Sequence, residues 1–126
     1  MTGATLLLRQ IHPNFVQDGF ASSVAFRPNE ADNGLMSTCD GDLIAAEASW
    51  THYTTVSKKQ SAGVTAVAVD ECTAEGLPAG PDPEPFPEHA VVDFTGVPEK
   101  HWRSKSKKLQ AKARARGWLY QVSTES

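Results

Sequence analysis

The chain has no long apolar run. Near the amino terminus the longest one is Leu6–Leu8, which ends at Arg9, whereas a membrane-spanning helix needs about 20 apolar residues. A signal peptide requires a basic start and an apolar stretch of about 7–15 residues, and Met1–Gly3 carry no charged side chain. We therefore expect no membrane partner and no export, and we predict a cytoplasmic location.

Cysteine and clustered metal ligands are also scarce. The two cysteines, Cys39 and Cys72, lie far apart, and without an export signal we expect both to be buried free thiols. The four histidines show no spacing typical of a metal site, and no glycine-rich phosphate loop is present. We predict no metal, and no cofactor unless the NAD-dependent alternative described below applies.

Charge is present but unevenly distributed. The 126 residues have a formal net charge of −3. Residues 1–96 hold four basic and thirteen acidic side chains, a net −9, and residues 97–126 hold eight basic and two acidic ones, a net +6. Because the length suits a single domain, the sequence predicts one acidic body joined to a basic C-terminal segment.

Hydropathy patterning predicts an α+β fold, a single small domain with about four strands and two main helices. The expected strands are 5–11, 20–27, 63–69 and 90–94. Asp18-Gly19 is a good turn sequence, so we expect the first two strands to pair in a hairpin-like manner.

Two helices and one short helical turn complete the prediction. Asp42 is expected to cap a helix that begins at Leu43, and a single helical turn is expected at 70–75. The second main helix should run from Pro98 to Gly117. Leu43, Ala46, Trp50 and Tyr53 should share one face of the first helix.

The predicted domain covers residues 1–120. Within it, the proline-rich segment 78–88 is expected to be a surface crossing without regular structure, and residues 118–120 a docking segment. Residues 121–126 are predicted to be a frayed tail.

The last helix is expected to be strongly basic, with one narrow buried stripe. The stripe consists of Trp102, Ser106, Leu109 and Ala113. The cations are Lys100, Arg103, Lys105, Lys107, Lys108, Lys112, Arg114 and Arg116. They either lie against the acidic body or contact an external anion such as the phosphates of a nucleic acid.

A different pattern lies in the first part of the chain, where an arginine in the first strand precedes a Ser-Ser strand and a later glutamate. This arrangement resembles the ADP-ribosyltransferase superfamily. The resemblance implies that Arg9 and His12 contact the phosphates and ribose of NAD, and that a glutamate stabilises an oxocarbenium-like transition state. The residues concerned are Arg9, His12, Ser22, Ser23 and Glu47, with Glu88 as an alternative glutamate.

Phe86 stands between two prolines and two glutamates. Such a segment is preorganised to present one aromatic ring to a partner, or to pin the loop to the core.

Three functions follow as hypotheses. The first is an accessory protein, similar to immunity, antitoxin or defence components, that binds a protein partner or self-associates within a larger assembly. The second is a nucleic-acid-binding protein that uses the basic helix. The third is an ADP-ribosyltransferase-like enzyme or toxin. Only the third makes the protein an enzyme.

Overall fold

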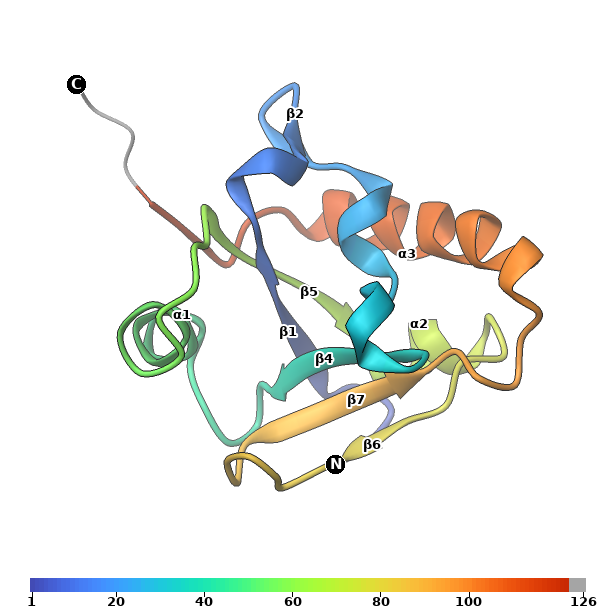
Figure 1. Cartoon of the computed structure of the whole chain (residues 1–126), viewed down its shortest axis with the longest axis horizontal. Coiled ribbons are helices and arrows are strands. Elements are labelled where there is room, and N and C mark those ends of the chain that lie inside the picture. Colours follow the sequence, from blue (N-terminus) through green and yellow to red (C-terminus); the bar gives the residue numbers. More distant parts are fainter. Residues whose placement is uncertain (123–126) are drawn as a thin grey trace.

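The computed structural model describes residues 1–122 and shows a single small α+β domain. Its centre is a six-stranded sheet in the order β6-β7-β4-β1-β5-β8, in which all neighbouring strands are antiparallel (Figure 1). The six strands are β1 (Leu6–Ile11), β4 (Leu35–Asp40), β5 (Gly63–Ala68), β6 (Ala79–Pro81), β7 (His89–Asp93) and β8 (Tyr120–Gln121).

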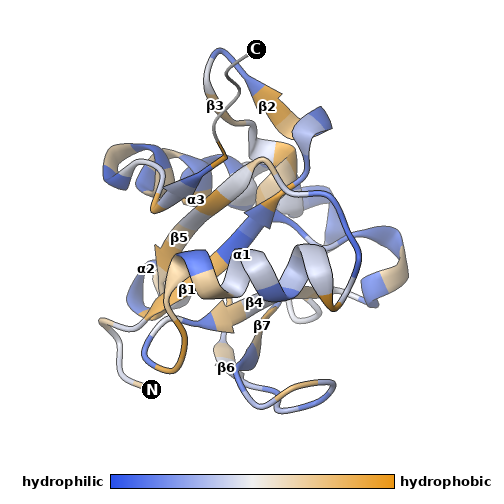
Figure 2. Ribbon diagram, turned by 90° about the vertical axis from the view of Figure 1, so that its left-hand side faces the viewer, coloured by the Kyte–Doolittle hydropathy of each residue, from blue (hydrophilic) through white to orange (hydrophobic). Residues whose placement is uncertain are grey.

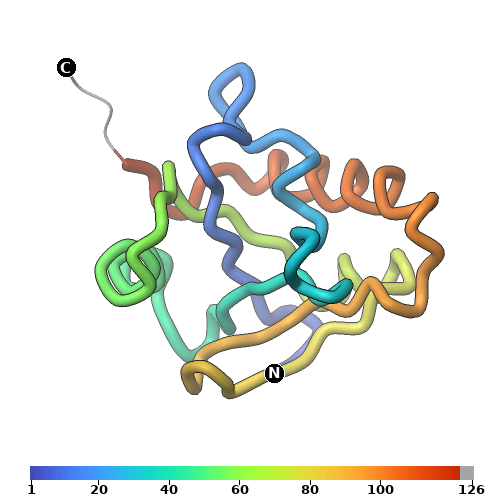
Figure 3. Tube along the Cα trace, in the orientation of Figure 1, coloured from blue at the N-terminus to red at the C-terminus, as the bar shows by residue number. Residues whose placement is uncertain are grey.

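A long connection, residues 12–34, leads from β1 to its neighbour β4. Figure 3 follows it along the chain. It contains a small hairpin of β2 (Val16–Gln17) and β3 (Phe20–Ala21). It also contains the 3-10 helices η1 (Pro13–Phe15), η2 (Ser23–Phe26) and η3 (Glu30–Asp32).

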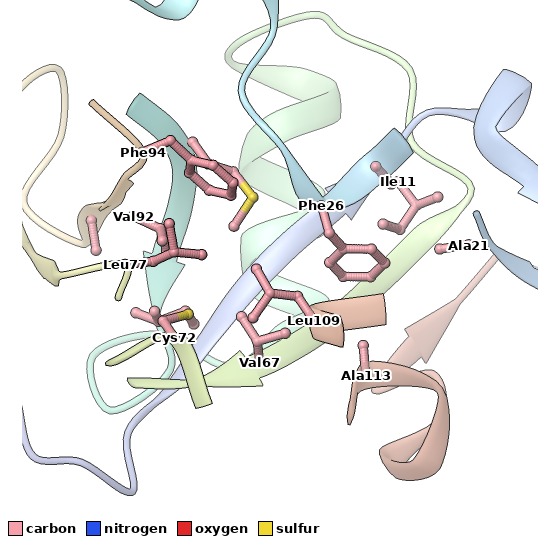
Figure 4. Close-up of a cluster of buried hydrophobic side chains, with 14 of the residues drawn as sticks. Ile11, Ala21, Phe26, Val67, Cys72, Leu77, Val92, Phe94, Leu109 and Ala113 are labelled. Atoms are coloured by element: carbon pink, nitrogen blue, oxygen red, sulfur yellow. The ribbon is translucent and has the colours of Figure 1, made fainter. Parts of the chain in front are cut away.

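One face of the sheet is covered by η2 and by helix α3 (Trp102–Arg116). Because side chains alternate along a strand, Leu7 and Ile11 of β1 point to this face and join Phe26, Phe94 and Leu109 in the main apolar core (Figure 4). Helix α2 (Val69–Thr73) borders this core through the buried Cys72. The 3-10 helix η4 (Glu99–His101) leads into α3.

The opposite face carries helix α1 (Ala46–Thr55), which lies across the strands in the foreground of Figure 2. Here the buried apolar cluster is smaller and consists of Leu8, Cys39, Val64 and Ala66. Polar bonds help to hold α1: Gln10 donates to Ser49 at 3.2 Å, and Trp50 donates to the Ser61 carbonyl at 3.0 Å.

Several predicted strands need correction. The expected strand 20–27 is extended only at Phe20–Ala21, after which η2 begins. The first two strands do not pair with each other, because β1 pairs with β4 and β5. The central strand β4 was not predicted, since its sequence LMSTCD has no clear alternation and runs directly into a turn.

The helix starts and the proline-rich segment also differ from the prediction. Helix α1 begins at Ala46 rather than Leu43, and Leu43 is exposed. Asp42 does not cap it: the Asp42 carboxylate accepts a hydrogen bond from the Thr5 hydroxyl. Segment 78–88 is not wholly irregular, because β6 forms the edge strand beside β7, a position where the backbone tolerates proline.

The end of the described chain is tied to the sheet. Gln121 pairs with Gly63 in the β8–β5 ladder, and Trp118 packs edge-on against Phe20. Gln121 therefore does not belong to a frayed tail, and residues 123–126 of that predicted tail lie outside the described residues. Within residues 1–122, none of the helices combines the length and the apolar character needed to span a membrane.

Candidate ligand pocket at a fork in the sheet

The candidate site lies where two central strands separate. Strand β1 pairs with β5 along its whole length, but with β4 only through Leu7↔Asp40 and Leu8↔Cys39. Beyond Leu8 the two strands diverge, so the backbone groups that face the gap need other partners. This fork leaves a space between the two central strands that ordinary ladder pairing would close.

The side chain of Arg9 occupies the fork. Its Nε donates to the carbonyl of Ala25 at 2.8 Å, and one terminal nitrogen donates to the carbonyl of Ser37 at 2.7 Å. The other terminal nitrogen makes a longer contact of 3.5 Å with the carbonyl of Arg27. Arg9 therefore joins β1 to β4 and to the η2 segment, where the backbone ladder is interrupted.

A pocket with a volume of about 450 Å³ opens beside this arginine. Its walls come from β1, β4, η1, α1 and the segment before β7. Aromatic rings line it at Phe15, Tyr53 and Phe86, and polar groups at Arg9, His12 and Ser37. Most of the other residues in the wall are polar as well, so the site combines aromatic surface with many hydrogen-bonding groups.

The pocket has little acidic charge to neutralise Arg9. Within residues 1–122, no carboxylate lies within 4.0 Å of its guanidinium group. Burial lowers the pKa of Arg9, against the electrostatic effects of Tyr53 and of Asp32, the acidic residue in the pocket wall. Since an arginine stays protonated inside proteins, the fork holds a buried positive charge with no direct ion-pair partner.

Tyr53 faces the same environment from α1. Burial raises the pKa of its hydroxyl, and the negative charge of Asp32 adds to this effect while Arg9 opposes it. The hydroxyl is therefore neutral at physiological pH and retains a proton to donate.

A serine and a histidine form a short hydrogen bond in the pocket wall. Ser37 Oγ lies 2.6 Å from His89 Nε2, and both residues line the pocket. On its other side, His89 Nδ1 lies 2.9 Å from the carbonyl oxygen of Asp82 and 3.5 Å from its carboxylate. The histidine thus bridges β4 to the turn between β6 and β7.

Cys39 lines the same pocket but is a poor nucleophile. Burial, together with the negative charge of Glu88, raises the pKa of its thiol to about 11. Cys72 has a pKa of about 12 for the same main reason, with Glu71 as the contributing charge. Both are buried free thiols.

The cations of α3 are divided between two environments. Lys105 and Lys108 both lie 3.5 Å from the carboxylate of Glu75, and Arg116 lies 3.1 Å from Glu71. Among residues 1–122, the remaining cations have no ion pair, and their side chains lie on the exposed surface of η4 and α3. They are Lys100, Arg103, Lys107, Lys112 and Arg114.

Only part of the predicted catalytic set gathers at the pocket. Arg9 and His12 line it. Phe86, which was predicted as a binding residue, also lines it, and its ring centroid lies 5.3 Å from that of His89 and 4.6 Å from that of His52. The others do not: Ser22 and Ser23 lie at the start of η2, Glu47 is exposed in the first turn of α1, and Glu88 is not in the wall.

The residues that sequence reasoning missed are Ser37, Tyr53 as a pocket residue, and His89. Ser37 and His89 are 52 positions apart, and no local motif marks either one. In the described part of the chain, no three His, Cys, Asp or Glu side chains are grouped so that they could hold a metal ion.

Comparison of the chain with protein-family models, with curated proteins and with solved structures finds no match. The pocket must therefore be interpreted from its own geometry.

Proposed function

We propose that the protein binds a small molecule carrying an anionic group, with Arg9 as the ion partner of that group. The observation that carries this proposal is the buried Arg9 guanidinium, which lines a pocket of about 450 Å³ and has no carboxylate within 4.0 Å among residues 1–122.

Electrostatics supports an anionic ligand. Burying a charge without a counter-charge is costly, even when polar groups surround it. A guanidinium group has five N–H donors, and Arg9 makes three hydrogen bonds to backbone carbonyls, one of them long. An anion in the pocket would supply both the missing charge and acceptors for the remaining donors.

The rest of the wall supports a ligand with a flat or apolar part. The volume falls in the usual range of about 300–1,000 Å³ for small-molecule sites. Phe15, Tyr53 and Phe86 supply aromatic surface, and the Tyr53 hydroxyl is available as a neutral donor. A small aromatic or otherwise planar carboxylate or phosphate fits this combination.

The NAD-dependent alternative shares Arg9 and His12 with this pocket. Its serines and glutamates, however, lie outside the wall. The geometry therefore favours anion binding over ADP-ribosyl transfer, and NAD is useful as one probe among several.

The test is an NMR titration of the ¹⁵N-labelled protein with sodium phosphate, 4-hydroxybenzoate and NAD as separate probes, and with phenol as a neutral control. We expect the amide signals of Ser37, Cys39 and Tyr53 to shift with at least one anion, and to shift less with phenol. Signals of α3 should stay in place. Absence of any saturable shift at the pocket with all three anions would overturn the proposal.

Two substitutions sharpen the test. Arg9→Gln should weaken anion binding at least tenfold, whereas Arg9→Lys should retain part of it because the charge remains. Arg103→Gln removes an exposed cation from α3 and should leave the binding unchanged. If Arg9→Gln does not fold, the titration of the unaltered protein at rising ionic strength still separates ion pairing from apolar binding.

A second function is supported by the exposed cations of α3. Four exposed cations on α3, together with Lys100 on η4, have no ion pair among residues 1–122. They favour an acidic macromolecular partner, and the acidic body of a second copy is one such surface. Light scattering at low and high salt tests self-association. Titration with DNA and RNA tests the nucleic-acid alternative, because phosphate contacts give a steep dependence on salt.

A further inference from the structure

We infer that Ser37 is a nucleophile activated by His89, and that the pocket hydrolyses small esters that carry an anionic group. This inference rests on the proposed ligand pocket, because both side chains belong to its wall.

The tautomer of His89 follows from its neighbours. The carbonyl oxygen of Asp82, 2.9 Å from Nδ1, can only accept a hydrogen bond. Nδ1 therefore carries the proton, and in the neutral ring Nε2 is left as an acceptor. The Ser37 hydroxyl, 2.6 Å away, must then donate to Nε2. This is the hydrogen-bond polarity that a general base requires.

The orientation of His89 is fixed on several sides. The Asp82 amide donates to the His89 carbonyl at 2.9 Å, so Asp82 and His89 are joined both through their backbones and through the imidazole ring. The ring of Phe86 packs edge-on against the imidazole. A third group thus orients the base, as in nucleophile–base–carboxylate triads, but here the acceptor of the Nδ1 proton is a backbone carbonyl.

The Asp82 carboxylate completes the arrangement. It lies 3.5 Å from Nδ1 and is partly exposed, so its charge reaches the imidazole without a direct hydrogen bond. When the imidazole takes up a proton, this negative charge stabilises the resulting cation. Asp82 is therefore a positioning and stabilising residue, and Ser37 and His89 are the reacting groups.

The proposed reaction balances with an ester and water. Ser37 Oγ bonds to the carbonyl carbon while its proton moves to His89 Nε2. The bond from carbon to the leaving oxygen then breaks, and the leaving group takes the proton from Nε2. A water molecule next attacks the acyl carbon and gives a proton to Nε2. Finally the bond from carbon to Oγ breaks, and Oγ regains its proton.

Arg9 sets the preference among esters. Its guanidinium group donates to the backbone carbonyl of Ser37 at 2.7 Å, so its charge lies at the residue that carries the nucleophile and in the same pocket wall. A positive charge at this place favours an anionic substrate, and it also favours the negative charge that develops on the carbonyl oxygen during attack.

The experiment compares 4-carboxyphenyl acetate, which is anionic, with phenyl acetate, which is neutral. Hydrolysis is followed by release of the phenol, and the acetylated protein is sought by intact mass and peptide mapping. We expect an acetyl group on Ser37 and a higher kcat/KM for the anionic ester. Ser37→Ala should abolish acetylation, and His89→Gln should lower the rate about 100-fold.

Two matched variants control for indirect effects. Ser22→Ala removes a serine outside the pocket wall. His52→Gln removes a histidine that packs against Phe86 but does not line the pocket. Both should keep the acetylation rate. Acetylation of a residue other than Ser37, or an unchanged rate in a folded His89→Gln variant, would overturn the inference.

The outcome also separates this inference from the proposed function. Binding of 4-hydroxybenzoate without any acetylation of Ser37 overturns the hydrolytic inference and leaves the ligand pocket in place. Acetylation of Ser37 with equal kcat/KM for the two esters supports Ser37 as the nucleophile. It overturns the role of Arg9 as the partner of an anionic group. Neither binding nor acetylation overturns both.

Discussion

The two faces of the central sheet are built from the same strands but differ in how they are filled. On the side of α3, apolar side chains from η2, the strands and α3 form a closed core around Phe26 and Leu109, both fully buried. On the side of α1, the apolar cluster is small, and a polar pocket adjoins it. One face is closed by apolar side chains, whereas the other borders the pocket, which reaches through the fork to Arg9 and Phe15.

The difference begins at one break in the strand pairing. Where β1 pairs with β5, the ladder is continuous and the alternating side chains pack against both faces. Where β1 leaves β4, the Ser37 carbonyl would lose its backbone partner, and the guanidinium of Arg9 replaces it. A long polar side chain thus keeps the fork open while satisfying the backbone.

The largest effect is expected from removing an aromatic ring on the closed face. Phe26→Ala should lower the free energy of unfolding by about 3–5 kcal/mol, because a fully buried ring is replaced by a cavity. Phe86→Ala, on the pocket side, should cost only about 1 kcal/mol, because its ring is half-buried at the pocket wall. Urea unfolding followed by circular dichroism measures both. Equal losses would mean that the pocket face is as tightly packed as the core.

An effect of intermediate size is expected in the alkylation rates of the two cysteines. Cys39 lies on the α1 face and Cys72 on the α3 face. With a pKa of about 11 against the usual 9.0, the thiolate of Cys39 at pH 8 is reduced about 100-fold, and alkylation slows in proportion. Cys72, with a pKa of about 12 and no exposed surface, should react more slowly still.

Iodoacetamide labelling followed by mass spectrometry measures these two rates. Both cysteines should react at ordinary rates in urea, which serves as the control. A bound anion should further protect Cys39 and leave Cys72 unchanged. Faster labelling of Cys72 than of Cys39 would reverse the comparison and show that the closed face opens more readily than the pocket.

Much of the closed face could be predicted from the sequence. The segments 5–11, 63–69 and 90–94 are mainly apolar, and they coincide with β1, β5 and β7 to within one residue at each end. These signals are local, so they are visible without a structure. The α+β class follows from the same elements, although the sheet has six strands rather than about four.

The pocket could be predicted only in part, because its parts are distant in sequence. Arg9 and His12, which line the pocket, were singled out through the resemblance to ADP-ribosyltransferases, as contacts for NAD. Ser37 lies on a strand that its own sequence does not indicate, and it meets His89 only because β4 pairs with β7. At Asp42 a clear local signal was misleading. Its side chain suits a helix cap, but its carboxylate accepts a hydrogen bond from the distant Thr5 hydroxyl instead.

The smallest effect is expected at the ion pairs that join α3 to α2 on the closed face. Burial alone would raise the pKa of Glu71, but hydrogen bonds from Arg116 and the Ala68 amide, together with the charges of Arg116 and Lys112, lower it below its ordinary 4.5. A carboxyl with a lowered pKa in the folded state stabilises the fold above its unfolded pKa. This stabilisation is lost as the pH falls below 4.5 and through the folded pKa.

Glu71→Gln should therefore lower the free energy of unfolding by about 1 kcal/mol at pH 7. The difference from the unaltered protein should shrink as the pH falls from 5 to 3, and it should also shrink in high salt. Glu84→Gln, at an exposed position with no ion pair in the described chain, is the matched control and should show neither change. Because Arg116 also donates to the Ala66 carbonyl of β5 at 2.8 Å, a larger loss would indicate that this arginine, released from Glu71, no longer holds α3 against the sheet.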